Sequence, residues 1–104
     1  MKVINRGLMV ELRKPGLCQW CGRPCPDGRD PHHIFHRGAG RVDIPENLIA
    51  LCRECHVRCH DGNLAGRQEL LAFSAESHGT TVDEIERKVY SLRADDSCKT
   101  WVIE

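Results

Sequence analysis

The most informative segment of this sequence is PENLIALCRECHVRCH, residues 45–60. Its apolar part, LIAL, predicts a short strand that leads into a Cys-x-x-Cys pair. His56 and His60 lie four residues apart, so on a helix that begins near this pair their imidazoles share one face and can bind one metal ion. The segment therefore predicts a strand, a turn that carries two thiolates and a helix that carries two candidate metal ligands.

Two Cys-x-x-Cys pairs, Cys18 with Cys21 and Cys52 with Cys55, indicate a structural zinc site. Each pair places two thiolates on one tight turn, and two such turns supply the four ligands of a tetrahedral zinc. A structural zinc contributes on the order of 10 kcal/mol of folding free energy. This suits a chain of 104 residues that has 2 Phe, 2 Trp and 1 Tyr for its core. Unpaired buried cysteines and a redox-active pair are the alternatives.

Three further cysteines, Cys25, Cys59 and Cys98, are expected to be small buried or surface residues. Cys25 follows Cys21 by four residues and is the one that could replace a zinc ligand. The total of 7 cysteines is odd, which argues against a disulfide framework. The sequence has no apolar run of the length of a membrane span or a signal peptide. We therefore expect a cytoplasmic protein that contacts no membrane.

The charge of the chain is balanced in total but not in distribution. It has 15 Lys and Arg against 15 Asp and Glu, and a zero net charge taken alone argues against nucleic acid binding. Residues 1–67, however, carry 11 basic and 7 acidic residues, whereas residues 68–104 carry 4 and 8. The larger segment is therefore basic enough for a nucleic acid partner.

Composition divides the chain, which we expect to form a single domain, into three segments. Residues 1–16 predict a strand or a helix, and the sequence does not choose between them. Residues 17–63 are rich in Cys, His, Gly and Pro, and predict loops and short strands held by metal. Residues 64–104 predict a helical part.

Within the helical part, local signals predict where the helices begin and end. Gly79 is a natural stop for the first helix. Residues 81–84, TVDE, have the form of a capping box and predict the start of a second helix of about three turns. Residues 98–104 predict a further strand or a tail.

Five histidines fall within residues 32–60, and the four-cysteine zinc site needs none of them. A single histidine is more often a surface or core residue than a ligand. Here, however, the adjacent pair His32 and His33, in a predicted short strand, joins the pair His56 and His60. This clustering predicts a second metal site.

Two runs, DPHHI at residues 30–34 and PENLIALCRECH at residues 45–56, followed by His60, resemble the HNH endonuclease motif. The resemblance covers about residues 18–61 and includes the four-cysteine zinc that is frequent in this family. It implies an α+β fold, a small zinc-stabilised ββα-metal domain over residues 17–63 with additional C-terminal helices. The paired histidines are similar to the colicin DNase form, in which His replaces the Asp before the catalytic His.

The resemblance implies catalytic roles for five residues. His33 matches the general base that activates a water molecule, for which a neutral imidazole is required. Asn47 matches the middle residue of the motif, whose amide braces the loop that carries His33. Three residues match the ligands of one divalent ion: His32, His56 and His60.

Other residues near the motif have weaker assignments. Asp30 is a candidate for orienting an imidazole through a carboxylate–histidine contact, with an ordinary turn residue as the alternative. Arg37 and Arg41 flank a glycine-rich turn and are candidate DNA phosphate contacts, with a solvated turn as the alternative. No role follows for His36.

The resemblance implies an enzyme that hydrolyses DNA phosphodiester bonds to a 5′ phosphate and a 3′ hydroxyl. Besides the structural Zn²⁺ it implies one active-site ion, Mg²⁺, Mn²⁺, Ni²⁺ or Zn²⁺. The small size leaves little surface for contacts with bases, so we expect low sequence specificity. A homodimer through residues 65–104, or a larger nuclease or phage assembly, stays open, in a bacterium or a phage-infected host. The alternative function is a zinc-knuckle nucleic-acid-binding or interaction domain without catalysis.

Overall fold

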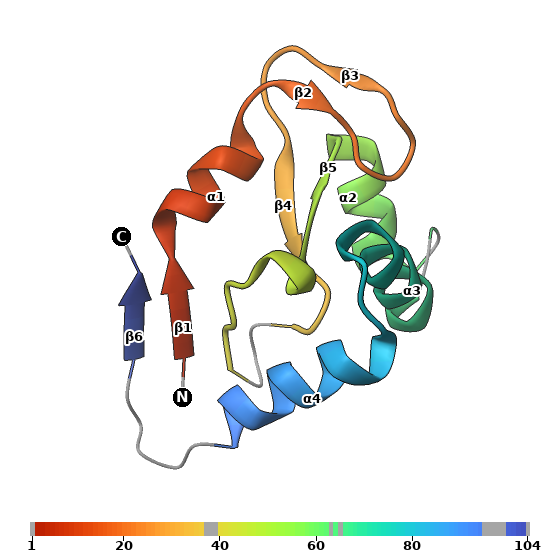
Figure 1. The fold of residues 1–104 in the computed structure, drawn as a ribbon. Helices are drawn as coiled ribbons and strands as arrows, with labels where there is room; N and C mark the ends of the chain where they lie inside the picture. The colour runs from red at the N-terminus through yellow and green to blue at the C-terminus, as the bar shows by residue number, and fades with distance from the viewer. Residues whose placement is uncertain (1, 37–39, 63, 65, 95–99, 104) are drawn as a thin grey trace.

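The structure of the chain is a computed structural model, and it describes residues 2–36, 40–62, 64, 66–94 and 100–103. Within these ranges no helix is both long enough and apolar enough to cross a membrane. The described elements, drawn in Figure 1, follow in the order β1 (Lys2–Asn5), α1 (Arg6–Arg13), β2 (Gly16–Leu17), β3 (Pro24–Cys25), β4 (Asp30–His33), η2 (Pro45–Asn47), β5 (Leu48–Leu51), α2 (Arg53–His60), α3 (Arg67–His78), α4 (Val82–Arg93) and β6 (Thr100–Ile103).

The centre of the molecule is a unit of two antiparallel strands and a helix, formed by β4, β5 and α2. The register of the two strands places His33 opposite Leu48. Every residue of β5 is buried, which explains its uninterrupted apolar sequence. Helix α2 begins two residues after β5 ends. The predicted order of strand, cysteine-bearing turn and helix is confirmed.

The first cysteine pair lies in the hairpin between the antiparallel strands β2 and β3. Gly22 in this turn has a φ of 77°, a conformation that favours glycine. Gln19 connects the hairpin to β5 because its backbone N–H donates to the Ala50 carbonyl at 2.9 Å and its side-chain oxygen accepts from the Ala50 N–H at 2.8 Å. These bonds hold both cysteine pairs at the same end of the central unit.

The N-terminal residues form both of the elements between which the sequence does not choose. Strand β1 comes first, and the Asn5 side chain then caps α1 by accepting from the Leu8 N–H at 3.0 Å. Strand β1 pairs in parallel with β6, so the C-terminal residues add a strand and not a tail. Figure 1 shows these two strands side by side at one edge of the molecule. Val3 also forms a bridge to Val42, which attaches β1 to the chain between β4 and β5.

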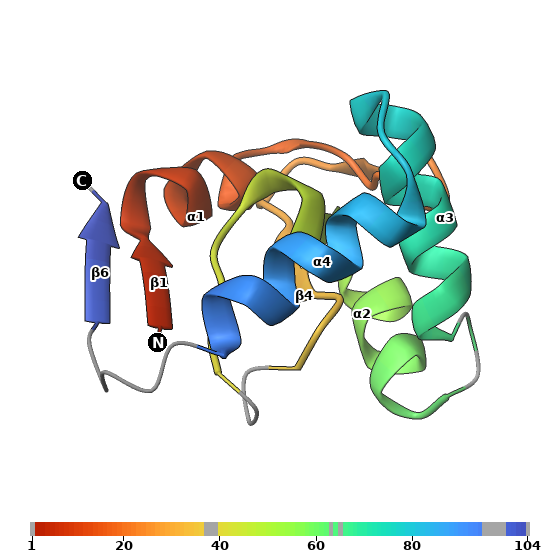
Figure 2. The same cartoon turned by 60° about the horizontal axis from the view of Figure 1, so that its bottom comes forward.

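Helices α3 and α4 are the two predicted helices, and Figure 2 shows α4 running from α3 towards β1. Helix α3 stops where predicted, because Gly79 caps it with a φ of 65°. The predicted capping box forms in part. The Thr81 hydroxyl accepts from the Glu84 N–H at 3.2 Å, whereas the Glu84 carboxylate accepts from the Thr80 hydroxyl at 2.6 Å.

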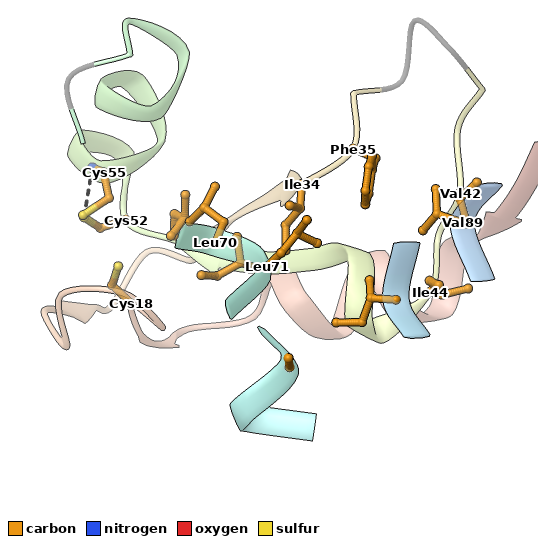
Figure 3. Packing of buried hydrophobic residues seen from close by; sticks show 14 of the residues in the cluster. Cys18, Ile34, Phe35, Val42, Ile44, Cys52, Cys55, Leu70, Leu71 and Val89 are labelled. Atoms are coloured by element: carbon orange, nitrogen blue, oxygen red, sulfur yellow. Dashed lines mark hydrogen bonds between the residues drawn. The ribbon is translucent and has the colours of Figure 1, made fainter. Parts of the chain in front are cut away.

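The hydrophobic core lies between the central unit and helices α3 and α4 (Figure 3). Ile34 and Phe35, which follow β4, are almost completely buried in it. Aliphatic side chains from several elements surround them: Val42, Ile49, Leu51, Leu71, Ile85 and Val89. Three of the predicted zinc ligands, Cys18, Cys52 and Cys55, belong to the same buried cluster. The predicted zinc site is therefore continuous with the core.

Candidate active site

The four predicted zinc ligands form one group, which we call the cysteine cluster: Cys18, Cys21, Cys52 and Cys55. Their sulfur atoms all lie within 4.8 Å of one another, and Cys21 Sγ lies 3.8 Å from Cys52 Sγ. A tetrahedral zinc with Zn–S bonds of about 2.3 Å requires sulfurs about 3.8 Å apart. The group could therefore hold zinc without rearrangement of its backbone.

Electrostatics around the cysteine cluster favour a bound cation. Burial alone would raise the pKa of the Cys18 thiol, but hydrogen bonds from the backbone of Cys21, Cys52 and Trp20 outweigh it and lower this pKa to about 6. Burial and the neighbouring thiols raise the pKa of Cys55. The backbone of these turns thus stabilises the thiolate form of Cys18. Four thiolates as close together as these need a cation to stabilise them.

The remaining cysteines lie apart from this group. Cys25 is buried, and its thiol donates to the Arg23 carbonyl at 3.5 Å. It is not a member of the cysteine cluster, so it does not replace a ligand there. Cys59 is partly buried. Cys98 lies outside the described residues.

A second group, the histidine cluster, consists of His32, His56 and His60. One ring nitrogen of each lies within 4.8 Å of the others, and His56 Nε2 is 3.0 Å from His60 Nε2. Strand β4 supplies the first residue and helix α2 the other two. Burial, followed by the neighbouring imidazoles, lowers the pKa of His32 to about 4. This imidazole is therefore neutral at pH 7 and has a lone pair for a metal ion.

Asp30 makes the carboxylate–histidine contact that the sequence suggests. Its Oδ2 lies 3.1 Å from His56 Nδ1. An ionised carboxylate only accepts hydrogen bonds, so His56 Nδ1 carries the proton and Nε2, which faces His60, has the lone pair. Asp30 also accepts from Arg53 at 3.2 Å. The tautomer of His56 is thus the one that a ligand at Nε2 requires.

Asn47 is completely buried and connects both sides of the chain segment that follows β4. Its Oδ1 accepts from the Phe35 N–H at 2.8 Å, and its Nδ2 donates to the Val42 carbonyl at 2.9 Å. Its own carbonyl accepts from the Ile34 N–H at 2.8 Å. These are the backbone contacts that a bracing amide would make.

Asp43, for which no role was predicted, contacts the predicted general base. His33 Nε2 lies 2.7 Å from Asp43 Oδ1, and both side chains are buried. A signal was present, because Asp43 stands between Val42 and Ile44, and an acidic residue within an apolar run needs a buried partner.

The structure describes one of the two predicted phosphate contacts of the glycine-rich turn. Arg37 lies outside the described residues. The Arg41 guanidinium is directed at Asp43 and not at solvent, with Nε 2.9 Å from Oδ1 and Nη2 2.8 Å from Oδ2. The buried charge of Asp43 accounts for this position, because a bidentate arginine is its strongest available partner.

The histidine cluster and His33 open into one pocket of about 490 Å³. His36, for which no role was expected, lines the same pocket. So do two arginines that the sequence did not single out, Arg13 from α1 and Arg53 from α2. Only the assembled fold brings Arg13 here, so no local pattern could have identified it. The pocket combines candidate metal ligands, a candidate base and two cations.

Comparison with known proteins agrees with the resemblance found in the sequence. The model of the HNH endonuclease family matches residues 18–62. The type IV methyl-directed restriction enzyme EcoKMcrA of Escherichia coli (strain K12) is 33% identical over 70 residues, which are 57% of this chain and 25% of that enzyme. The chain thus spans about a quarter of this relative. No solved structure matches the chain. The resemblance of residues 18–62 to the HNH endonuclease family and the predicted α+β fold are confirmed.

Proposed function

We propose that this chain, whose residues 18–62 belong to the HNH endonuclease family, is as a whole one domain that acts as a metal-dependent DNA endonuclease. The observation that supports this most is the shared pocket, because His33 and the histidine cluster open into the same space of about 490 Å³. In the in-line hydrolysis of a phosphodiester, a base can activate the attacking water while a cation stabilises the charge that develops on the phosphate and the leaving oxygen.

The histidine cluster fits a divalent ion by its donor set, since three imidazole nitrogens already converge. Neutral nitrogen donors favour Zn²⁺, Ni²⁺ or Mn²⁺ over Mg²⁺ by affinity, and any of the four can be the physiological ion. A divalent ion held there supplies Lewis-acid stabilisation of the negative charge that develops on the phosphate. Asp30 keeps His56 in the tautomer that this requires.

His33 would act as the general base. Its imidazole takes a proton from a water molecule while the water oxygen forms a bond to phosphorus. The bond between phosphorus and the 3′ oxygen breaks, and the leaving oxygen takes a proton from solvent, which gives a 5′ phosphate and a 3′ hydroxyl. Asn47 would hold the backbone next to His33 in place through its bonds to Phe35 and Val42.

Arg13 and Arg53 would contact phosphates next to the one that is cut, because both line the pocket. Contacts of this kind position the duplex without reading its sequence, which agrees with the expected low specificity. A zinc-knuckle domain that only binds nucleic acid would account for the cysteine cluster. A domain of that kind would not explain why three imidazoles and His33 converge on one pocket.

Cleavage of supercoiled plasmid tests the proposal. The full chain is incubated with Mg²⁺, Mn²⁺, Ni²⁺ or Zn²⁺, beside His33→Ala and a control, His78→Ala, whose histidine ends α3 outside this pocket. We expect metal-dependent nicking or linearisation that falls by about 10²–10⁴-fold in His33→Ala and persists in the control. Equal rates in all three proteins would refute a catalytic role for His33. The ratio of nicked to linear product tests whether a homodimer forms, and plasmids with and without methylated bases test substrate preference.

A further inference from the structure

We infer that Asp43 is a positioning residue of the proposed active site. Asp43 holds His33 in the tautomer that carries its proton on Nε2, so that Nδ1 accepts the proton of the attacking water. The inference rests on the proposed function and adds to it a residue and an atom. It follows from the contacts of a single buried carboxylate.

The first step is that Asp43 is ionised. The residue is 1% exposed, and burial alone would raise the pKa of this carboxyl. Hydrogen bonds from Arg41, His33 and the Asn5 backbone outweigh burial and lower the pKa instead. Arg41 donates at 2.8–3.1 Å to both carboxylate oxygens, so a full positive charge compensates the buried negative one.

The second step is the direction of the bond between Asp43 and His33. An ionised carboxylate has no proton to give, so at 2.7 Å the Nε2–H of His33 donates to Oδ1. A neutral imidazole carries one proton only, and its lone pair is then on Nδ1. The proposed base thus has a defined atom, since a ring that is also in contact with Asp43 cannot use Nε2 to remove a proton from water.

The third step is that the N-terminal strand holds Asp43. The Asn5 N–H donates to Asp43 Oδ2 at 2.9 Å. Two backbone bonds flank this contact: the Val3 N–H donates to the Arg41 carbonyl at 2.9 Å, and the Asp43 N–H donates to the Val3 carbonyl at 2.8 Å. Strand β1 lies outside the residues that match the family model. A segment outside the motif therefore helps to orient its base.

Asp43→Asn is the informative substitution, because it keeps the shape of the side chain and removes its charge. The amide can turn its N–H₂ group towards His33, which would then accept at Nε2 and carry its proton on Nδ1. The corresponding change in the serine protease triad acts through the wrong tautomer of its histidine and lowers kcat by about 10⁴-fold. We expect a loss of kcat of about 10²–10⁴-fold in plasmid cleavage, with KM for DNA within about threefold of the unsubstituted protein. Asp83→Asn, at an exposed position of α4, is the matched control.

A direct readout needs no substitution. The ¹⁵N chemical shifts of the His33 ring, measured in the full chain at a pH where the ring is neutral, report which nitrogen carries the proton. We expect Nε2–H in the unsubstituted protein and a shift towards Nδ1–H in Asp43→Asn. A ring that carries its proton on Nδ1 in the unsubstituted protein overturns the inference, even if Asp43→Asn does not fold.

The two proposals fail in different ways. Suppose that the protein cleaves DNA and that His33→Ala is inactive, but that Asp43→Asn keeps its full kcat. The proposed role of Asp43 is then wrong, and the nuclease function stands. If no tested metal ion produces His33-dependent cleavage, the nuclease function is wrong, and the ¹⁵N spectrum still decides the tautomer.

Discussion

Helix α2 carries ligands of both clusters, and the two clusters differ in enclosure. Cys52 precedes the helix and Cys55 lies in its first turn, whereas His56 and His60 belong to the histidine cluster. Cys55 and His56 are adjacent in sequence, but a rotation of about 100° per helical residue directs them to different groups.

The cysteine cluster offers four ligands, three of them buried, and joins the hydrophobic core. The histidine cluster offers three ligands and opens into a pocket. Four protein ligands close the coordination of a structural zinc, while three leave a position for substrate. If the proposed function holds, one short helix separates a structural zinc site from a catalytic metal site by the direction of its side chains, and substitutions in the two clusters should have different consequences.

The largest expected effect is on folding, in the cysteine cluster. Cys52→Ser removes a ligand, and the loss approaches the roughly 10 kcal/mol that a structural zinc contributes, which is comparable to the whole stability of a small domain. We expect no cooperative thermal transition by circular dichroism and less than one zinc per chain. Cys25→Ser is the control, since this buried thiol lies outside the cluster. A Cys52→Ser protein with bound zinc and an unchanged Tm would contradict the assignment.

The next effect should be on activity with stability preserved. His56→Ala removes a ligand of the histidine cluster that is not part of the core. We expect cleavage to fall by more than the roughly 10–100-fold that loss of an outer partner of a ligand costs. The zinc of the cysteine cluster should be retained, with Tm close to that of the unsubstituted protein. Loss of that zinc together with activity would mean that the two clusters are not independent.

Asp30→Asn should have a smaller effect of the same kind. The amide oxygen can still accept from His56, but the charge that fixes its tautomer is lost. We expect a 10–100-fold increase in the metal concentration needed for half-maximal cleavage, at about unchanged maximal rate. The control is Glu54→Gln, an exposed carboxylate on the same helix that pairs with Arg23. If both variants need the same higher metal concentration, the cause is the loss of a negative charge near the site and not the loss of the contact with His56.

The smallest effect should be on DNA binding. Arg13 lines the pocket of the histidine cluster, and we expect Arg13→Ala to weaken binding a few-fold and to lower the salt dependence of log Kd by about one unit. Arg87→Ala, on α4 outside this pocket, is the control. Binding isotherms at several salt concentrations measure both quantities. Identical salt slopes for the two variants would remove Arg13 from the proposed DNA contacts.

The sequence predicted those parts of the molecule that local patterns determine. The spacing of His56 and His60 fixes a shared helix face, and Gly79 ends α3 because a positive φ suits glycine best. To predict that the two Cys-x-x-Cys pairs lie together, only one further fact was needed, namely that a structural zinc binds four thiolates. For the histidine pair and for Gly79, the cause lies within a few residues of the signal.

The parts that could not be predicted depend on contacts between distant segments. The bond from Asn5 to Asp43 joins residues 38 positions apart, and Arg13 reaches the pocket only after α1 packs against β4. The sequence of residues 1–16 did not decide between a strand and a helix, and the segment contains both, β1 followed by α1. The partner of β1 lies at the other end of the described chain, so no pattern within β1 could indicate it.

The parallel pairing of β1 with β6 has a consequence for the order of assembly during synthesis. Lys2 pairs with Thr100, whereas every ligand of both clusters lies between Cys18 and His60. A nascent chain on the ribosome can therefore bring the ligands of both clusters together, and pair β1 with Val42, before β6 leaves the exit tunnel. Strand β6 is exposed at all four of its residues and is then the last element to attach.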